Sequence, residues 1–222
     1  MDDGTPFRLS LGLGEDGSVT SSGKVPSTLD VAELSTSLTK EVGEGIEQSV
    51  LPPSNAGWNE ASLAGAAALG KLRSGELALT EDSLALSGVA TPDGKAEAEA
   101  LIAALPEGVS GTSAIELYDD GEPFSLEMVK SEAGTTASGK FPAELAATDV
   151  VGDAPQTDIR NAFISDETGG FAAAVANGVE GLASLDEGKL SVVGTDISLT
   201  GVAKTPTEAD AANVALNSLP EG

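Results

Sequence analysis

Alternating apolar and polar residues predict short strands that pair as hairpins. In GELALTEDSLALSGVA, residues 75–90, leucines occupy every second position on both sides of a short polar turn. A period of two is typical of a strand with one buried face, and a turn between two such runs is typical of a hairpin. The stretch is therefore predicted to form two antiparallel strands.

A helix is predicted directly after this hairpin. Pro92 suits a first helical turn, and Thr91 is a suitable N-cap before it. The apolar residues of TPDGKAEAEALIAAL share one helical face. We expect the helix to end at PEG, with Gly108 in the left-handed conformation, and VSGTSAIEL to return as a strand.

The same series of elements recurs along the chain. DDGTPF at Asp2 returns as DDGEPF at Asp119, and LPEG at Leu105 returns at Leu219. Such self-similarity is the signature of tandem units. We expect two units, of which the second begins near Asp119.

Each unit is predicted to contain two related modules, because the patterns SGKVP, SGVATP, SGKFP and TGVAKTP follow one another along the chain. Additional helices are predicted at Asn59–Leu72 and Gly169–Leu185, before the second and fourth hairpins. We expect an α+β fold of (α)ββαβ modules, in which helices cover one face of small mixed sheets. The predicted modules are residues 1–58, 59–118, 119–168 and 169–222, the last without its final strand.

The glycine of the repeated pattern is predicted to be structural. A glycine near a strand end permits a bulge or close packing of a helix against a sheet. A surface that a ligand approaches is the alternative, but a ligand site needs to occur only once, whereas this glycine occurs in every module. The four positions are Gly23, Gly88, Gly139 and Gly201.

Trp58 and Phe171 begin the two additional helices. Aromatic residues make up only 3% of the chain, so a large ring is most valuable as a core anchor. We therefore expect both rings in the core. An exposed contact role is the alternative.

Composition excludes several classes of function. The formal charge of −25 repels phosphate backbones and anionic lipids, so we expect no nucleic-acid partner and no direct binding to an anionic membrane. The chain has no Cys and no His. It therefore has no thiolate or imidazole for a metal, no Cys nucleophile and no His general base. We expect no cofactor.

Two motifs that bind ligands in other proteins are predicted to be structural here. GTTASGKF, residues 134–141, has the glycine and lysine spacing of a phosphate-binding loop, but Phe141 stands where that loop needs Ser or Thr, and the segment has a strand pattern. Paired acids also lie beside glycines or turns, without the spacing of an EF-hand loop. They predict weak association of divalent cations at most, and their positions are Asp2, Asp3, Glu15, Asp119, Asp120 and the SDE at Ser165.

The module resembles the BON domain, in its α-β-β-α-β order, in the glycine near the end of the second strand and in the GV that opens the last strand. The segment GWNEASLAGAAALGKLRSGELALTEDSLALSGVATP is similar to the repeated segment of OmpA-family envelope proteins from marine and phototrophic α-proteobacteria. In that family such repeats precede a C-terminal OmpA-like domain that binds peptidoglycan. The resemblance implies a non-catalytic protein of the periplasm or outer membrane.

The last module poses a further question, because its LNSLPEG is not followed by the strand expected from the first unit. Either a strand from elsewhere fills that edge, or the chain is part of a longer protein. The initiator-like Met1 favours the second explanation, as does the resemblance, since an OmpA-like domain is expected after such repeats.

Three hypotheses for function remain at this point. The leading one is a non-catalytic structural or interaction segment of the cell envelope, a spacer or binding region whose partners are other envelope proteins or further copies of the chain. The alternative is a secreted, self-assembling surface or filament subunit that joins through an exposed sheet edge. An acid-pair hydrolase is least favoured, because sugar cleavage usually needs a cleft with stacking aromatics.

Overall fold

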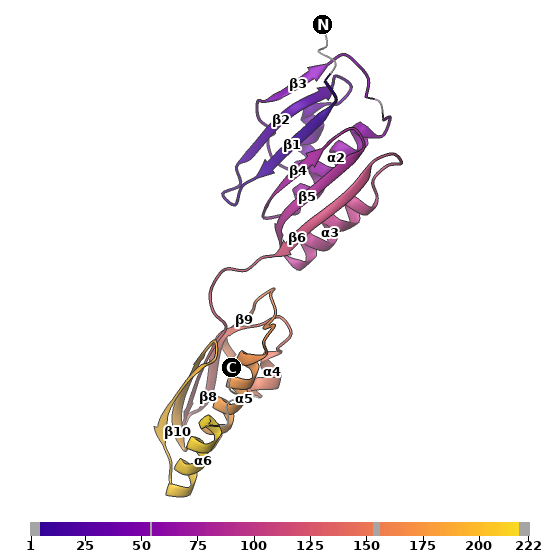
Figure 1. The fold of residues 1–222 in the computed structure, drawn as a ribbon. Helices are drawn as coiled ribbons and strands as arrows, with labels where there is room; N and C mark the ends of the chain where they lie inside the picture. The colour runs from indigo at the N-terminus through magenta and orange to yellow at the C-terminus, as the bar shows by residue number, and fades with distance from the viewer. Residues whose placement is uncertain (1–4, 54, 153–155, 218–222) are drawn as a thin grey trace. The chain divides into compact units, whose positions relative to one another are not determined.

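The computed structural model describes residues 5–53, 55–152 and 156–217, which form two compact units (Figure 1). Unit 1 comprises Met1–Tyr118 and unit 2 comprises Asp119–Gly222. The boundary between them lies where the DDG of the second copy begins. Each unit has its own hydrophobic core.

Unit 1 contains one six-stranded sheet with the strand order β3-β2-β1-β4-β5-β6. The β2–β3 and β5–β6 pairs are parallel, and the others are antiparallel. In chain order its elements are β1 (Arg8–Leu13), β2 (Val19–Pro26), α1 (Val31–Leu38), β3 (Ile46–Ser49), α2 (Trp58–Leu69), β4 (Ser74–Leu79), β5 (Ser83–Ala90), α3 (Pro92–Ala103) and β6 (Ser110–Leu117).

Unit 2 repeats this arrangement with a five-stranded sheet of order β11-β10-β7-β8-β9. Its β8–β9 pair is parallel, and the others are antiparallel. In chain order its elements are β7 (Ser125–Ser131), β8 (Gly134–Phe141), α4 (Ala147–Val151), β9 (Gln156–Asn161), α5 (Gly170–Ala183), β10 (Glu187–Val193), β11 (Asp196–Val202) and α6 (Pro206–Asn217).

The fold is α+β with mixed sheets, as the sequence predicts, but each sheet is shared by two modules. In unit 1 the antiparallel pairing of β1 with β4 joins the first hairpin to the second, and in unit 2 β7 pairs with β10 in the same way. The first strand of an isolated hairpin would leave one row of backbone groups unpaired, and this pairing satisfies them. A small sheet is expected for each module from the sequence, whereas the two modules of a unit each contribute half of one larger sheet.

Helices cover one face of each sheet, because apolar residues alternate along the strands (Figure 1). In β1, Leu9 and Leu11 are buried, whereas Arg8 and Ser10, which alternate with them, are exposed. The buried side meets the helices, which supply their own apolar stripes. The opposite face carries mostly small and polar side chains, with exposed valines such as Val129 in unit 2.

The helix after the second hairpin begins where predicted but ends earlier. Thr91 is confirmed as its N-cap, since the Thr91 hydroxyl accepts a hydrogen bond from the Gly94 amide at 3.2 Å. The prediction that it continues to PEG is wrong, because α3 ends at Ala103. Pro106 disfavours helical geometry in the residue before it. Gly108, with φ of +91°, instead serves the turn that leads into β6.

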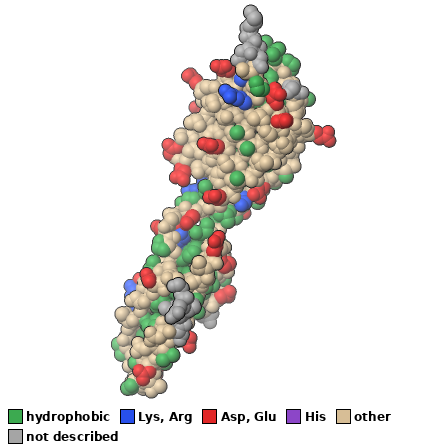
Figure 2. Space-filling view, viewed as in Figure 1, with side chains coloured by type: hydrophobic (Ala, Val, Ile, Leu, Met, Phe, Trp, Pro, Cys, Tyr) green, Lys and Arg blue, Asp and Glu red, His purple; other side chains and the backbone are tan. Residues whose placement is uncertain are grey.

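Acidic side chains are dispersed over the face of the protein that Figure 2 shows. Figure 2 shows Asp and Glu on the visible face of both units without a single acidic patch. This distribution accompanies the formal charge of −25. None of the helices in the described part of the chain combines the length and the hydropathy that crossing a membrane requires.

Candidate functional site

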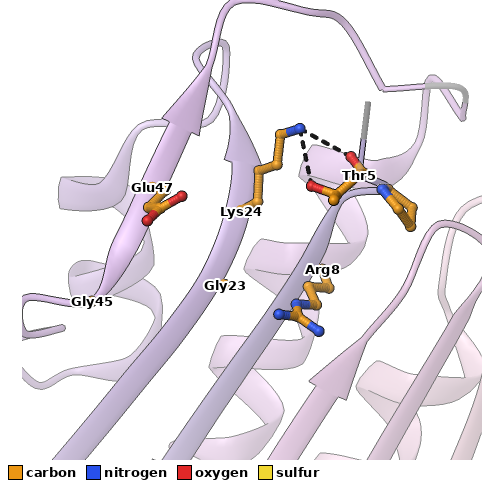
Figure 3. Close-up of a pocket in the computed structure, with 7 residues that line it drawn as sticks. Thr5, Arg8, Gly23, Lys24, Gly45 and Glu47 are labelled. Atoms are coloured by element: carbon orange, nitrogen blue, oxygen red, sulfur yellow. Dashed lines mark hydrogen bonds between the residues drawn. The ribbon is translucent and has the colours of Figure 1, made fainter. Parts of the chain in front are cut away.

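A pocket on the open sheet face of unit 1 is the first candidate site (Figure 3). Strand register places Arg8 beside Lys24, and Lys24 beside Glu47, so that three charged residues lie across β1, β2 and β3. The pocket encloses about 350 Å³. We call it the β1–β3 pocket, and it is lined by Thr5, Pro6, Arg8, Gly23, Lys24, Gly45 and Glu47.

Lys24 is held at the rim of this pocket. Its ammonium donates to the Thr5 carbonyl at 3.0 Å and to the Thr5 hydroxyl at 3.3 Å, as the dashed lines in Figure 3 mark. The same ammonium lies 5.8 Å from the centroid of the Phe7 ring, within the range of a cation–π contact. Lys24 thus ties the entry of β1 to the end of β2.

Two glycines shape the pocket, because the backbone passes too close for a side chain. A Cβ on Gly23 would lie 2.2 Å from the Arg8 carbonyl oxygen, and one on Gly45 would lie 2.4 Å from that of Ser21. Both residues have positive φ, +131° and +133°. Only glycine accommodates this combination. The β1–β3 pocket thus brings two cations and one anion together on the sheet face.

Unit 2 has an ion cluster at the equivalent position. Lys140, the counterpart of Lys24, is only 4% exposed and donates to the Asp120 carboxylate and, at 2.6 Å, to the Glu122 carbonyl. Arg160, the counterpart of Glu47, donates to Asp120 at 3.0 Å and also to Glu122. We call this the Lys140 cluster, and its members are Asp119, Asp120, Glu122, Lys140 and Arg160.

The Lys140 cluster is a tie between strands. The segment Asp119–Glu122 enters β7, Lys140 lies near the end of β8, and Arg160 lies on β9. The ammonium of Lys140 holds the pKa of Asp120 below its ordinary range by hydrogen bonding, and Arg160 adds to this through its charge. The carboxylates are engaged by these cations, so the acid pair at Asp119 and Asp120 is occupied by the protein itself.

The other acid pairs are used for local hydrogen bonds. Asp16 accepts from the Ser18 amide at 2.9 Å within its turn. Asp166 accepts from the Phe171 amide at 2.8 Å and from the Thr168 hydroxyl at 2.9 Å, at the start of α5. Burial raises the pKa of Asp166, but these hydrogen bonds outweigh it and leave the pKa lowered. The described residues contain no cluster of three metal-ligating side chains, and Asp2 and Asp3 lie outside them.

The four repeated glycines lie against a neighbouring strand. A Cβ at any of them would come within 2.3 Å of a backbone oxygen, that of Arg8, Ser74, Ser125 or Glu187. The positions in question are Gly23, Gly88, Gly139 and Gly201. The first three also have positive φ, between +131° and +153°. These positions therefore need glycine because a neighbouring strand passes close to them, and not because a helix packs closely on the sheet.

Trp58 and Phe171 lie in the cores of their units, at 0% and 2% exposure. The Trp58 ring stacks at a tilt on Phe7 with 5.9 Å between centroids, and its indole nitrogen donates to the Thr80 carbonyl at 2.8 Å. Phe171 contacts both Phe124 and Phe141, at 5.8 Å in each case. Each ring therefore anchors the leading helix of a module to its sheet.

The segment with phosphate-loop spacing is part of a strand. Residues 134–141 form β8, which pairs with β7 on one side and β9 on the other. Lys140 in this segment is committed to the Lys140 cluster. The expected structural role of GTTASGKF agrees with this position.

A second, open pocket of about 470 Å³ lies at a loop end of unit 1. Asn55 closes one side of it by donating to the Gly108 carbonyl at 2.6 Å. Its lining is Asn55, Ala56, Glu81, Asp82 and Gly108. The two carboxylates give it the opposite charge from the β1–β3 pocket.

Sequence reasoning did not single out Lys24, Lys140 or Arg160. A signal was present, since a lysine follows the repeated glycine in SGKVP and SGKFP and a DDG precedes each copy at the same position. An acid pair and a lysine that recur together predict an ion pair between them. The parallel strand that brings in Arg160 had no such signal.

Comparison with known proteins gives no relative for this chain: no protein-family model matches it, and no curated protein matches it.

Proposed function

We propose that this chain is a non-catalytic structural and interaction segment of the bacterial cell envelope, located in the periplasm or at the outer membrane. The location comes from the resemblance of its modules to BON domains and to the repeats of OmpA-family proteins. Its partners are other envelope proteins. The proposal assigns no reaction and no cofactor to the chain.

One observation carries the interaction role. In both units the apolar side chains gather mainly on the helix-covered face of the sheet, and the other face carries mostly polar and small residues, together with the exposed Val129 in unit 2. An exposed sheet face of mixed character that recurs in both units suits contact with another protein better than it suits enclosure of a small substrate.

The use of the charged residues supports the non-catalytic part of the proposal. Lys140, the most buried charge among the described residues, is neutralised within its own unit, and its cluster joins β8 and β9 to the segment before β7. An enzyme site would instead aim such groups at a bound substrate. These charges therefore stabilise the fold.

Co-sedimentation with envelopes tests the proposal. We expect the purified chain to pellet with α-proteobacterial cell envelopes, and to stay in the supernatant when the envelope proteins have been removed by protease. Vesicles of phosphatidylethanolamine and phosphatidylglycerol should not retain it, because the net charge of −25 is repelled. Retention by the vesicles, or equal binding to stripped and intact envelopes, would contradict a protein partner.

Self-assembly is the second candidate, and it is favoured by the outer edge of β11, with which no strand among the described residues of unit 2 pairs. A long exposed edge strand is a template for pairing with another chain. Light scattering with and without salt and Ca²⁺ separates the two candidates. We expect a monomer under every condition, whereas growth into large assemblies would establish the filament subunit instead.

A further inference from the structure

The last strand of unit 1 has a long open edge. β6 pairs with β5 in continuous register from Ser110 to Leu117. No strand among the described residues pairs with the other edge of β6. The strand contains no proline and no lysine, and Glu116 is its only charged residue. Such an edge has little of the usual protection against pairing with another strand.

Other edges in the described chain differ from this one. β3 has only four residues, and the pairing of β9 with β8 contains a register shift. β11 is long and regular, but it corresponds to β5, whose outer edge is occupied by β6 in unit 1. The outer edge of β6 is therefore the long, regular edge that the described residues of unit 1 leave open.

The backbone groups of β6 alternate between its two edges. The amides of Ser110 and Tyr118 donate toward β5. Because successive strand residues point in opposite directions, the even-numbered residues of β6 face β5. The N–H and C=O groups of Gly111, Ser113 and Ile115 therefore point to the open edge.

This edge is complementary to the same edge of a second copy. A two-fold axis at Ser113 places the two copies of that residue opposite each other, and it places Gly111 opposite Ile115 on both sides. These are the residues whose backbone groups face outward, as hydrogen-bonded pairs of an antiparallel ladder require. A shift of the register by one residue would oppose outward-facing to inward-facing groups.

Side-chain sizes also fit this register. Ile115 lies on the helix-covered side of the sheet and is 5% exposed. The residue opposite it in the other copy, Gly111, has no side chain. A Cβ on Gly111 would lie 2.5 Å from Ile102 and 2.7 Å from Leu105, so α3 itself keeps this position small. Each Ile115 thus meets a glycine beside an apolar part of α3.

No acidic side chain of β6 faces its own copy in this register. Glu116 lies opposite Ser110, and the two copies of Glu116 are six residues apart along the strands, which is about 20 Å. This exceeds the Debye length of about 8 Å at physiological ionic strength. On α3, Glu99 has Lys95 of the same copy as its ion-pair partner at 4.0 Å. Charge therefore permits this local contact.

We propose that β6 pairs in antiparallel orientation with β6 of a second copy, about a two-fold axis at Ser113. The two six-stranded sheets then become one continuous sheet. The fold already joins two modules by an antiparallel edge, at β1 and β4 of unit 1. This pairing goes beyond the envelope role proposed above and does not rest on it.

The dimer formed in this way is weak and closed. A single strand pair is a small interface, and interfaces below about 1,200 Å² are weak or transient. The net charge of −25 on each copy opposes association at long range. The chain therefore stays monomeric at the micromolar concentrations of light scattering and pairs at millimolar concentrations. Two-fold pairing ends with two copies, so it forms no filament.

Dilution of the ¹⁵N-labelled full chain tests the pairing. Between millimolar and micromolar concentration, the amide resonances of Gly111, Ser113 and Ile115 should shift, and translational diffusion should be slower at the higher concentration. Added salt should enlarge the shifts, because it screens the repulsion between copies. Resonances of β6 that stay constant up to millimolar protein, or shifts centred on another edge, would overturn the proposal.

A cysteine at the two-fold axis tests the register, because the chain has no cysteine of its own. Hydrogen-bonded antiparallel pairs have Cα atoms about 5.5 Å apart, which a disulfide can span. With oxidised glutathione and millimolar protein, Ser113→Cys should form linked dimers at least about tenfold faster than Ser198→Cys. Ser198 is the matched control, since it is an exposed serine in the middle of β11. Equal rates, or a faster Ser198→Cys, would refute the pairing.

Proline at the axis should block the edge without disturbing the pairing of β6 with β5. The Ser113 amide faces outward, so its removal in Ser113→Pro costs no hydrogen bond within the copy. The concentration-dependent shifts should disappear while the resonances of β5 stay in place. Ser113→Lys is the second variant, because like charges directly opposite each other weaken a strand pair. Shifts that persist in either folded variant would contradict an axis at Ser113.

Discussion

Unit 1 and unit 2 contain corresponding hairpins and helices in the same order, yet the inward-facing residues of β5 are buried and those of β11 are not. Leu86 is 2% exposed and its counterpart Leu199 is half-buried, although both lie on the inner face of a sheet beside an α-helix. β6 pairs with the outer edge of β5, whereas no strand among the described residues of unit 2 pairs with that edge of β11. A second neighbouring strand thus accompanies the fuller burial of the leucine in β5.

The units also differ in how they close the entry to their first strand. Unit 1 has the β1–β3 pocket, in which Lys24 is bound to Thr5. Unit 2 has the Lys140 cluster, in which an arginine replaces the glutamate on the parallel strand. The glutamate of unit 1 and the arginine of unit 2 at this position thus give the two sheet faces opposite charges on the parallel strand.

The strongest test of this comparison is removal of the two aromatic anchors. Trp58→Ala should destabilise unit 1 by about 3–5 kcal/mol, and Phe171→Ala should destabilise unit 2 by a similar amount, because a buried ring leaves a cavity. Circular dichroism during denaturation measures the free energy of unfolding of both variants. Trp58→Phe is the control, and it should lose less stability because a ring remains in the core. An unchanged melt for Trp58→Ala would mean that the ring does not anchor the core.

Glycine substitutions test whether close strand approach is equally strict in both units. Gly23→Ala and Gly139→Ala should each cost about 2–4 kcal/mol, since positive φ and a steric clash with a backbone oxygen both oppose the new Cβ. Gly121→Ala separates the two causes, because Gly121 has φ of +73° and open space around it. It should cost about 1–2 kcal/mol. Equal losses at all three positions would show that the clash contributes nothing.

Removal of the buried ammonium tests the Lys140 cluster. Lys140→Met should destabilise unit 2 by about 1.5–3 kcal/mol, because Asp120 loses a charge-assisted hydrogen bond and the Glu122 carbonyl loses its donor. Lys71→Met in unit 1 is the matched control: its pair with Glu97 is exposed and should contribute less than about 1 kcal/mol. Urea denaturation measures the loss of unfolding free energy in each variant. Similar losses in the two variants would mean that the buried and the exposed ion pair contribute equally.

Acid titration should produce the smallest difference. The pKa values of Asp120, Glu144 and Asp166 are lowered in unit 2, and that of Asp16 is lowered in the described part of unit 1. A lowered folded pKa stabilises the protein above the ordinary carboxyl range, and this contribution disappears as pH falls through the folded value. The free energy of unfolding of unit 2 should therefore fall more than that of unit 1 as the pH falls through this range, and urea denaturation followed by amide NMR at successive pH values measures both. A larger fall for unit 1 would contradict this.

Local patterns predicted the elements of the fold well, because period and turn chemistry act within a few residues. Alternating leucines marked β4 and β5, and the helix expected at Asn59–Leu72 is α2 at Trp58–Leu69. The end of α3 was missed because Pro106 acts on the residue before it. The pairing of β1 with β4 could not be predicted, because the local sequence of a strand does not specify which strand of another module it pairs with.

The candidate sites were less predictable for the same reason. The repeated glycines were visible, but the strand that approaches each of them was not. The ion pair between Lys140 and Asp120 was implied by recurrence of DDG and SGK, whereas Arg160 reaches it only through the parallel pairing of β9 with β8. Contacts made by a neighbouring strand depend on topology rather than on local sequence.

The β1–β4 junction pairs equivalent positions of the two modules of a unit. Gly23 lies opposite Leu9 and Gly88 opposite Gly75, so Leu11 and Leu77 hold the same place in their modules. These two leucines face each other across the junction, and Met128 faces Leu190 in the same way in unit 2. A surface that meets its own copy about a two-fold axis is an isologous interface. Each unit therefore has the geometry of a homodimer whose two subunits are one polypeptide.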